Sequence, residues 1–221
     1  RVIDRGDFIL GQEVERFEAE FAAFISARYA VAVNSGTDAL VLALRALGIG
    51  AGDEVITVPN SFIASAACIS LVGAKPVFVD VQSNLNIDPA LIEAALTPKT
   101  KAILPVHLTG RAAEMDKVLK IAAEHGLYVI EDCSQAVLAE YQGKRVGTLG
   151  QIGCFSLHPL KTLSACGDGG VLTTHDPKIA ERLRVLRNLG LESRDECVVW
   201  SGNSRLDTFQ AAILLVKLKY V

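Results

Sequence analysis

The sequence predicts an α/β protein, in which a mostly parallel sheet is covered by helices on both faces. Short apolar segments lie at 30–33, 54–58, 76–79, 101–106 and 127–130. Several of the segments between them have the apolar periodicity of a helix. The apolar segments are apolar throughout and do not alternate with polar residues. Such runs are typical of parallel strands buried on both faces, and the repeated order strand, helix, strand is typical of the α/β class.

The helices are predicted from apolar periodicity and from the residues that end them. They are expected at 14–25, 38–47, 61–72, 88–96, 115–125 and 177–187, with a last one beginning near Leu206. Segment 61–72 is nearly all apolar, which predicts a helix buried on most sides. Asp88 and Pro89 are typical of a helix start. Two later strands are expected at 153–156 and 171–174, and no domain boundary is visible.

Composition and charge exclude several functional classes. The chain has 221 residues, 50% of them hydrophobic, which is enough for one domain with a sizeable core. Its formal net charge is −3, and charges of one sign do not cluster in the sequence. No basic surface for nucleic acid or for a membrane is therefore indicated. The longest apolar stretch, 62–74, contains two serines and is too short to span a bilayer. We therefore expect no nucleic acid and no membrane among its partners.

The cysteines indicate a reducing compartment. Cys68, Cys133, Cys154, Cys166 and Cys197 are scattered, odd in number and form no CxxC pair. This pattern favours free thiols in a cytoplasmic protein over a disulfide framework or a zinc site. No metal is expected.

Polar residues follow four of the predicted strands, at the edge where an open α/β sheet binds its ligands. They are Ser35, Thr37, Asn60, Ser61, Asp132, Gln135, Ser156 and Lys161, and Gly36 and Phe62 lie among them. The lysine lies in a loop that closes with the glycine cluster GDGG (167–170). So many glycines indicate a backbone that bends sharply or approaches a ligand closely. A candidate site is therefore expected at this edge.

Two parts of this edge have both a structural and a chemical interpretation. Ser35-Gly36-Thr37 opens a helix, where free amides, hydroxyls and the positive dipole end make an anion site, most naturally for phosphate. Ser35 or Thr37 can equally be an ordinary N-cap. Asp132 ends a strand and is a partly desolvated carboxylate that needs a cation, either a protonated ring nitrogen or an arginine. Its neighbour Glu131 lies on the opposite face and can instead be the carboxylate that faces the helices.

Phe62 and Lys161 complete the chemistry. Phe62 is either a core aromatic or a flat surface on which a ring stacks. Lys161 is either a solvated charge or an amine that forms a Schiff base with a carbonyl. A phosphate site, a stacking ring, a carboxylate for a pyridinium nitrogen and a Schiff-base lysine together specify pyridoxal 5'-phosphate (PLP). No single element is specific, but the combination is.

Several stretches of the chain carry a family resemblance. They are VNSGTDAL (33–40), GDEVI (52–56), VPNSF (58–62), GAKPVFVDV (73–81), PVHL (105–108), IEDCSQA (130–136), FSLHPLK (155–161), GDGG (167–170) and NSRLD (203–207). On these residues the chain resembles the DegT/DnrJ/EryC1/StrS sugar aminotransferases, from about Ile9 to its end. The resemblance implies an aspartate-aminotransferase-like, fold type I large domain (α/β/α) that binds PLP over residues 1–221.

The resemblance implies roles around the cofactor ring. Lys161 is expected to carry the internal aldimine and then to move a proton between the substrate carbon and the cofactor carbon. Asp132 is expected to pair with the pyridinium nitrogen, and Phe62 to stack on the ring. Gln135 is expected to contact the side of the ring that bears the phenolic oxygen.

The resemblance also implies the phosphate contacts and the reaction. Gly36, Thr37 and Ser156 are expected to bind the phosphate, and Asn203 to reach the phosphate in the neighbouring subunit of a homodimer. The implied reaction moves an amino group from an amino acid, usually glutamate, to a keto-sugar that is commonly nucleotide-linked. Two alternatives stay open: another PLP-dependent sugar enzyme such as a dehydratase or lyase, and a non-catalytic regulatory protein of the same fold. Lys161 argues against the family's dehydrating branch, which has histidine there.

The chain departs from the family pattern in two places. Ser201 and Gly202 precede Asn203, where the family usually has glycine and then tyrosine or tryptophan. The chain also begins at an arginine and ends in what reads as an unfinished helix, and the family continues into a smaller C-terminal domain. We expect a longer protein, with this span inactive by itself.

For the remaining polar residues near the site, structural roles are favoured, although a direct catalytic role stays open for His107 and His158. This group contains His107, His158, Asp168, Arg205 and Asp207. Cys133 and Cys166 are expected to be small buried thiols, and Trp200 is a candidate subunit contact.

Overall fold

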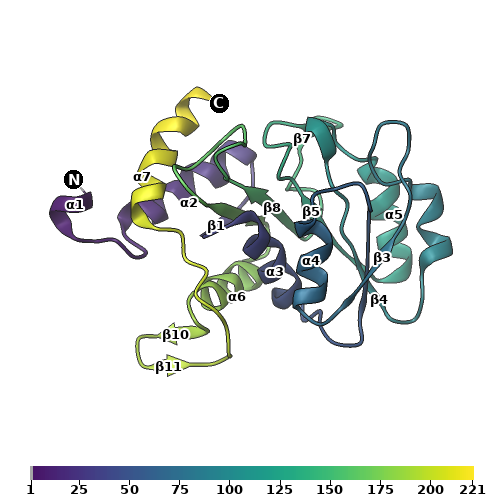
Figure 1. Ribbon diagram of the computed structural model, residues 1–221, viewed down its shortest axis with the longest axis horizontal. Coiled ribbons are helices and arrows are strands. Elements are labelled where there is room, and N and C mark those ends of the chain that lie inside the picture. Colours follow the sequence, from purple (N-terminus) through teal and green to yellow (C-terminus); the bar gives the residue numbers. More distant parts are fainter. Residues whose placement is uncertain (1) are drawn as a thin grey trace.

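A seven-stranded sheet lies between two layers of helices in the computed structural model, which describes residues 2–221 (Figure 1). The strand order is β1-β9-β8-β5-β4-β2-β3. The strands are β1 (Tyr29–Val33), β2 (Glu54–Thr57), β3 (Lys75–Phe78), β4 (Thr100–Ile103), β5 (Tyr128–Asp132), β8 (Ile152–Ser156) and β9 (Gly170–Thr174). Among the described residues, β9 runs antiparallel to its two neighbours, β1 and β8, and the other six strands of this sheet all run in one direction. The predicted mostly parallel sheet is confirmed.

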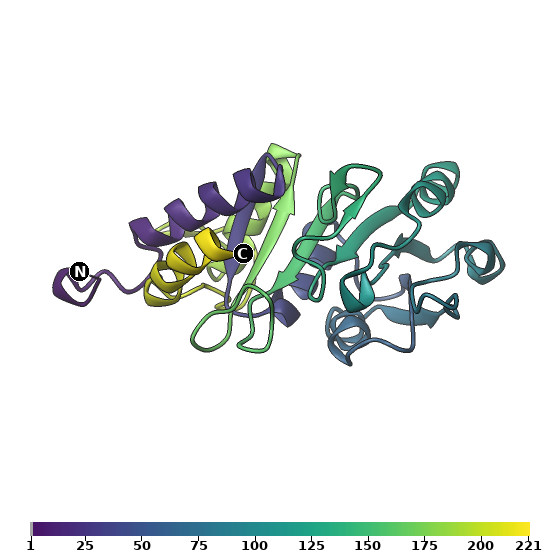
Figure 2. The ribbon, with the colours of Figure 1, turned by 90° about the horizontal axis from the view of Figure 1, so that it is seen from above.

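Helices cover both faces of this sheet. They are α2 (Gln12–Ile25), α3 (Gly36–Ala46), α4 (Ala64–Leu71), α5 (Met115–His125), α6 (Pro177–Arg187) and α7 (Thr208–Lys217), whereas the short α1 (Val2–Arg5) contacts α7 and lies away from the sheet (Figure 1). Helix α3 packs against α4 and α6, and α2 packs against α7. Figure 2 shows α2 and α5 on the side of the sheet opposite α4. The expected three-layer α/β/α arrangement is therefore present.

Strand β1 shows why the strands are apolar throughout. Val31 and Val33 belong to the core cluster that contains the apolar face of α3, whereas Ala30 and Ala32 belong to the cluster that contains Phe17 of α2. Successive side chains of a strand point to opposite faces. Because both faces are covered, both sets must be apolar.

Helix α4 is less buried than its sequence predicts. It is shorter than the expected 61–72 segment, and it buries only Ser65, Cys68 and Ile69. Ile63 just before it is 70% exposed and Leu71 at its end is 68% exposed. The prediction of burial on most sides is wrong for this chain, because the helix packs against α3 along one face and leaves the rest of its apolar surface open.

Two other regions differ from the expectation. The predicted helix at 88–96 is two short 3-10 turns, η1 (Pro89–Leu91) and η2 (Glu93–Ala95), although Asp88 caps the first as expected. Short segments often take the tighter 3-10 form. Two small hairpins were not predicted, because their strands are two or three residues long and mostly polar. They are β6 (Glu140–Tyr141) with β7 (Lys144–Arg145), and β10 (Leu191–Ser193) with β11 (Glu196–Cys197).

The structure tests the expectations about the cysteines and about membrane-spanning segments. All five cysteines are free, as expected. Cys133 is buried, but Cys166 is exposed, so the expectation of a buried thiol there is wrong. Cys166 lies in a loop whose backbone is bound by the Gln210 side chain at the surface. Among the described residues, no helix combines the length and the apolar character that a membrane span requires.

Candidate active site

The predicted residues come together around a cavity of 500 Å³. Its lining includes the predicted residues Gly36, Thr37, Phe62, Asp132, Gln135, Ser156 and Lys161. They come from segments that follow β1, β2, β5 and β8, at the carboxyl ends of these strands. A larger groove of 720 Å³ lies between α1, α2 and α7, but none of the predicted site residues lines it. The predicted site residues are therefore concentrated in the smaller cavity.

Asp132 is the carboxylate of the cavity. It is the last residue of β5 and is only 3% exposed. Its Oδ2 accepts a hydrogen bond from Ser65 Oγ at 2.8 Å, and its Oδ1 accepts one from the Ser134 amide at 3.1 Å. Ser61 lies one helical turn before Ser65, and the two hydroxyls are 2.8 Å apart. No lysine, arginine or histidine among residues 2–221 forms an ion pair with Asp132, so its buried charge can accept a cationic ligand.

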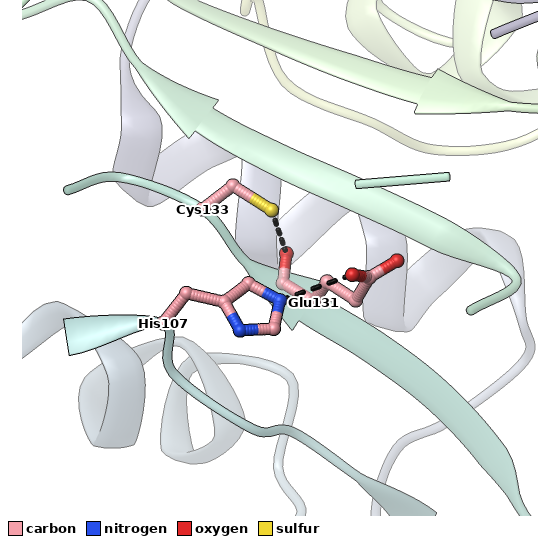
Figure 3. A group of neighbouring side chains, drawn as sticks. All are labelled: His107, Glu131 and Cys133. Atoms are coloured by element: carbon pink, nitrogen blue, oxygen red, sulfur yellow. Dashed lines mark hydrogen bonds and ion pairs between the residues drawn. The ribbon is translucent and has the colours of Figure 1, made fainter. Parts of the chain in front are cut away.

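Glu131, the preceding residue, points to the other face of the sheet. It is fully buried, and its carboxylate accepts a hydrogen bond from the His107 ring (Figure 3). The carboxylate also accepts hydrogen bonds from three backbone amides. Burial raises the pKa of this carboxyl, but the hydrogen bonds from His107 and from the amides of Gly147 and Gly150 outweigh burial and hold the pKa below its ordinary value. Glu131 is therefore an ionised structural carboxylate. Asp132, and not Glu131, faces the cavity.

The lowered pKa of Glu131 predicts a pH dependence of stability. Its folded-state pKa lies below the unfolded value, so its stabilisation is complete above the unfolded pKa and is lost as the pH falls through the folded pKa. Glu131→Gln is expected to lower the free energy of unfolding by about 3 kcal/mol at neutral pH, because it leaves buried donors unmatched. Urea unfolding across the acid range should show the wild-type advantage shrinking as the pH falls. An advantage that is constant with pH would contradict this assignment.

The start of helix α3 lies at the cavity, where the sequence analysis expects an anion site. Ser35 is the N-cap, and its Oγ accepts a hydrogen bond from the Asp38 amide at 3.0 Å. The N-cap interpretation of Ser35 is therefore confirmed, and the free amides are those of Gly36 and Thr37 in the first turn. A Cβ on Gly36 would lie 2.6 Å from the Cβ of Ser156, so only glycine fits there. The end of β8 and the start of α3 thus meet in close contact.

The glycine cluster at 167–170 allows β9 to lie close to the start of α3. A Cβ on Gly170 would lie 2.3 Å from the carbonyl oxygen of Ser35. Gly170 begins β9, which pairs with the end of β1. The sequence indicated a close approach at these glycines, and at Gly170 the approaching group is the protein's own backbone.

Lys161 lies in a turn at the cavity mouth. Its amide donates to the His158 carbonyl oxygen at 2.8 Å, and the Leu160 amide donates to His158 Nδ1 at 3.2 Å. The Lys161 side chain is partly exposed, and within residues 2–221 its ammonium group has no hydrogen bond or ion pair. The amine is therefore free to move toward a ligand in the cavity.

Phe62 and Gln135 are surface residues of the same cavity. Phe62 is 74% exposed, which excludes a role as a plain core aromatic in this chain. Gln135 is also exposed. Both side chains therefore have room to contact a ligand.

Asn203 is a predicted site residue that does not line the cavity. It is exposed and pairs with Asn188 in an isolated bridge. The next residue, Ser204, is buried and donates to the Asp38 carboxylate at 2.5 Å. The segment is therefore fixed beside the start of α3, with Asn203 outside the cavity of its own chain.

The sequence missed several residues of the cavity. Ser65 holds Asp132, and the signal for it is a polar residue within the nearly all-apolar segment 61–72. His158 and Asp168 also line the cavity, although the sequence analysis favours structural roles for them. His107 is fully buried and does not line it.

Comparison with known proteins finds solved structures of the same architecture and identifies the family of this chain. The crystal structure of DesV from Streptomyces venezuelae, in complex with a ketimine intermediate, superposes with a TM-score of 0.97 at 49% identity, over 100% of this chain and 60% of that one. The class is thus fold type I. The family model of the DegT/DnrJ/EryC1/StrS aminotransferases matches residues 1–221, and the chain belongs to this family.

Two curated relatives have different names. The dTDP-3-amino-3,4,6-trideoxy-alpha-D-glucose transaminase of Streptomyces venezuelae is 49% identical over 222 residues, which are 100% of this chain and 59% of the relative. A protein of Geobacillus stearothermophilus named pleiotropic regulatory protein is 49% identical over 215 residues, 97% of this chain and 58% of the relative. The chain therefore spans somewhat under two thirds of the length of these relatives.

Proposed function

We propose that the protein is a PLP-dependent aminotransferase that moves an amino group from an amino acid, glutamate in our proposal, to a nucleotide-linked keto-sugar. The observation that carries the proposal is the meeting of a free lysine amine, Lys161, and a buried unpaired carboxylate, Asp132, in one cavity. Membership of an aminotransferase family supports it, as does the name of the Streptomyces relative.

The residues present fit PLP on three physical grounds. The buried Asp132 has free acceptor capacity and no cation among the described residues, so a protonated ring nitrogen would satisfy it. Gly36 and Thr37 offer first-turn amides for a phosphate dianion. The exposed ring of Phe62 offers a flat apolar surface in the same cavity.

Each side chain would have a defined task with the cofactor in place. When bound, PLP supplies a carbonyl for imine formation and a ring that accepts electrons. Asp132 would keep a proton on the ring nitrogen, and Ser65 and the Ser134 amide fix the direction of its carboxylate. Gln135 would contact the side of the ring that bears the phenolic oxygen. Gly36, Thr37 and Ser156 would hold the phosphate end, which fixes the ring relative to Lys161.

Lys161 would act at two stages. Its Nζ would first hold the cofactor covalently, and after exchange with the amino donor the free amine would move a proton between two carbon atoms. The absence of any internal partner for this ammonium among residues 2–221 is what permits such movement. Leu108 and Leu160, with His158, line the rest of the cavity and are candidates for contact with the substrate.

We further propose a homodimer with shared sites, in a cytoplasmic protein whose thiols are reduced. Asn203 is exposed and lies outside its own cavity, which leaves it free to bind the phosphate in the partner's cavity. We also propose that these 221 residues form the large PLP-binding domain of a longer protein and do not act alone.

Mixing two defective variants tests the shared site. Full-length Lys161→Ala protein and full-length Asn203→Ala protein are each expected to be impaired. When they are unfolded together and refolded as a mixture, each hybrid dimer should have one site with both residues intact, and part of the activity should return. Activity that never exceeds the sum of the separate variants would contradict the shared site.

The regulatory alternative rests on the name of the Geobacillus relative. A non-catalytic regulator of this fold would keep its function after Lys161→Ala, whereas an aminotransferase would lose it. A dehydratase or lyase would release a dehydrated or cleaved sugar, and mass spectrometry of the products separates that outcome from amino transfer.

A further inference from the structure

A group of buried polar side chains lies directly behind the candidate site and has no part in the proposed reaction. It consists of Glu131, His107 and Cys133, whose polar atoms lie within 4.8 Å of one another (Figure 3). His107 Nε2 donates to Glu131 Oε2 at 3.0 Å. The other three donors to the carboxylate are the amides of Gly147 at 2.9 Å, Leu149 at 2.8 Å and Gly150 at 2.7 Å.

The chemistry of this group is that of a hydrogen-bond network and not of a metal centre. The Ala113 amide donates to His107 Nδ1 at 3.1 Å, so the ring proton is on Nε2, which has no lone pair to offer. Burial raises the pKa of the Cys133 thiol well above its ordinary value, and the nearby charges of Glu131 and Asp132 raise it further. The thiol therefore stays protonated, and both carboxylate oxygens are already bound by donors.

The network is joined to Asp132 through the backbone. The His107 amide donates to the Asp132 carbonyl oxygen at 3.0 Å, and the Asp132 amide donates to Pro105 at 2.9 Å. Glu131 and Asp132 are consecutive in β5, so their side chains point to opposite faces. Fixing Glu131 on one face therefore fixes the direction of Asp132 on the other.

The same carboxylate also ties the end of β5 to β8. The 147–150 segment, which supplies the three amides, packs without free space: a Cβ on Gly153 would lie 2.4 Å from Gly147 Cα, and a Cβ on Gly150 would lie 2.6 Å from the Val129 carbonyl oxygen. Gly153 is in β8, the strand that ends at Ser156. Glu131 thus joins β5 to His107 and to the 147–150 segment that leads into β8.

We propose that the hydrogen bond between His107 and Glu131 is a positioning device that sets the direction in which Asp132 enters the cavity. Neither residue lines the cavity, and both act through β5. The inference rests on the proposed function for the identity of the ligand, which is PLP.

Two substitutions of His107 separate its two ring nitrogens. In His107→Gln the side-chain amide can replace Nε2–H and still donate to Glu131. In His107→Asn the shorter side chain can replace Nδ1 as acceptor for Ala113 but cannot reach Glu131. Full-length wild type and both variants are titrated with PLP, while the visible absorption spectrum of the bound cofactor is recorded as a function of pH.

His107→Gln is expected to stay near wild type, whereas His107→Asn is expected to bind PLP about tenfold more weakly, since a hydrogen bond to a charged group is lost. The pH dependence of its spectrum should also change in the same direction as that of Asp132→Asn. Equal effects of the two variants, or a larger effect of His107→Gln, would overturn the inference.

A second pair of variants remains informative if the His107 variants do not fold. Glu18 is another buried carboxylate, paired with Arg187 and bound by the Ala32 amide, and it lies outside the cavity. Glu131→Gln and Glu18→Gln should both lower thermal stability, but only Glu131→Gln should alter the spectrum of bound PLP. Identical spectra in the two would overturn the inference, whereas wild type that binds no PLP would instead contradict the proposed function.

Discussion

Replacement of Lys161 by alanine is expected to abolish amino transfer in the full-length protein while leaving the fold intact. The side chain has no internal partner within residues 2–221, so its removal breaks no contact that stabilises the chain. The rate should fall by at least about 10³-fold, since both the covalent attachment and the proton carrier are lost. The measurement is the formation of the aminated sugar and of the keto acid from glutamate.

A matched lysine provides the control. Lys120 is on α5 and has only a long contact, 3.9 Å, with Glu124 at the surface. Lys120→Ala should leave the rate unchanged. If Lys161→Ala retained wild-type activity, the aminotransferase proposal would be wrong and the regulatory alternative would gain support.

Asp132→Asn is expected to have the second largest effect. The substitution keeps the shape: its oxygen can still accept from the Ser134 amide, and its NH2 group can donate to Ser65 Oγ, but the negative charge is lost. Without that charge the ring nitrogen of bound PLP would lose its proton near neutral pH. The rate should fall by about 10²–10³-fold, the usual range for loss of one preorganised electrostatic contact, and the spectrum of the bound cofactor should change.

An exposed aspartate controls for the loss of charge itself. Asp80 lies beyond β3, where its Oδ1 accepts from the Val81 amide at the surface. Asp80→Asn should change neither rate nor spectrum. A wild-type rate in Asp132→Asn would show that this carboxylate is not the partner of the ring.

Most of the fold follows from the sequence because the central strands are apolar on both faces. Helices α2, α5 and α6 follow equally well, since each has a clear periodicity and clear ends. Elements without an apolar pattern could not be predicted. The hairpin of β10 and β11 is one such element, because its strands are short and exposed.

Much of the candidate site also follows from the sequence, because of where its residues lie relative to the predicted strands. The carboxyl-edge rule brings Asp132, Lys161 and Thr37 to one place without any knowledge of side-chain contacts. That rule says nothing of the residues behind the site. The tie between His107 and Glu131 joins segments 24 residues apart, and only the packed structure brings them into contact.

The exposed apolar surface of α4 shows another limit. An almost entirely apolar sequence predicts burial, but sequence alone does not say whether the covering surface belongs to the same chain. In this chain one face of α4 packs on α3, and Leu71 stays open.

The most direct test of the central claim is chemical labelling of the full-length protein. The protein is incubated with PLP and reduced with borohydride, and the modified peptide is identified by mass spectrometry. The account predicts a single stoichiometric adduct on the Nζ of Lys161, absent from Lys161→Ala. Folded protein whose Lys161 remains unlabelled would contradict the proposed function.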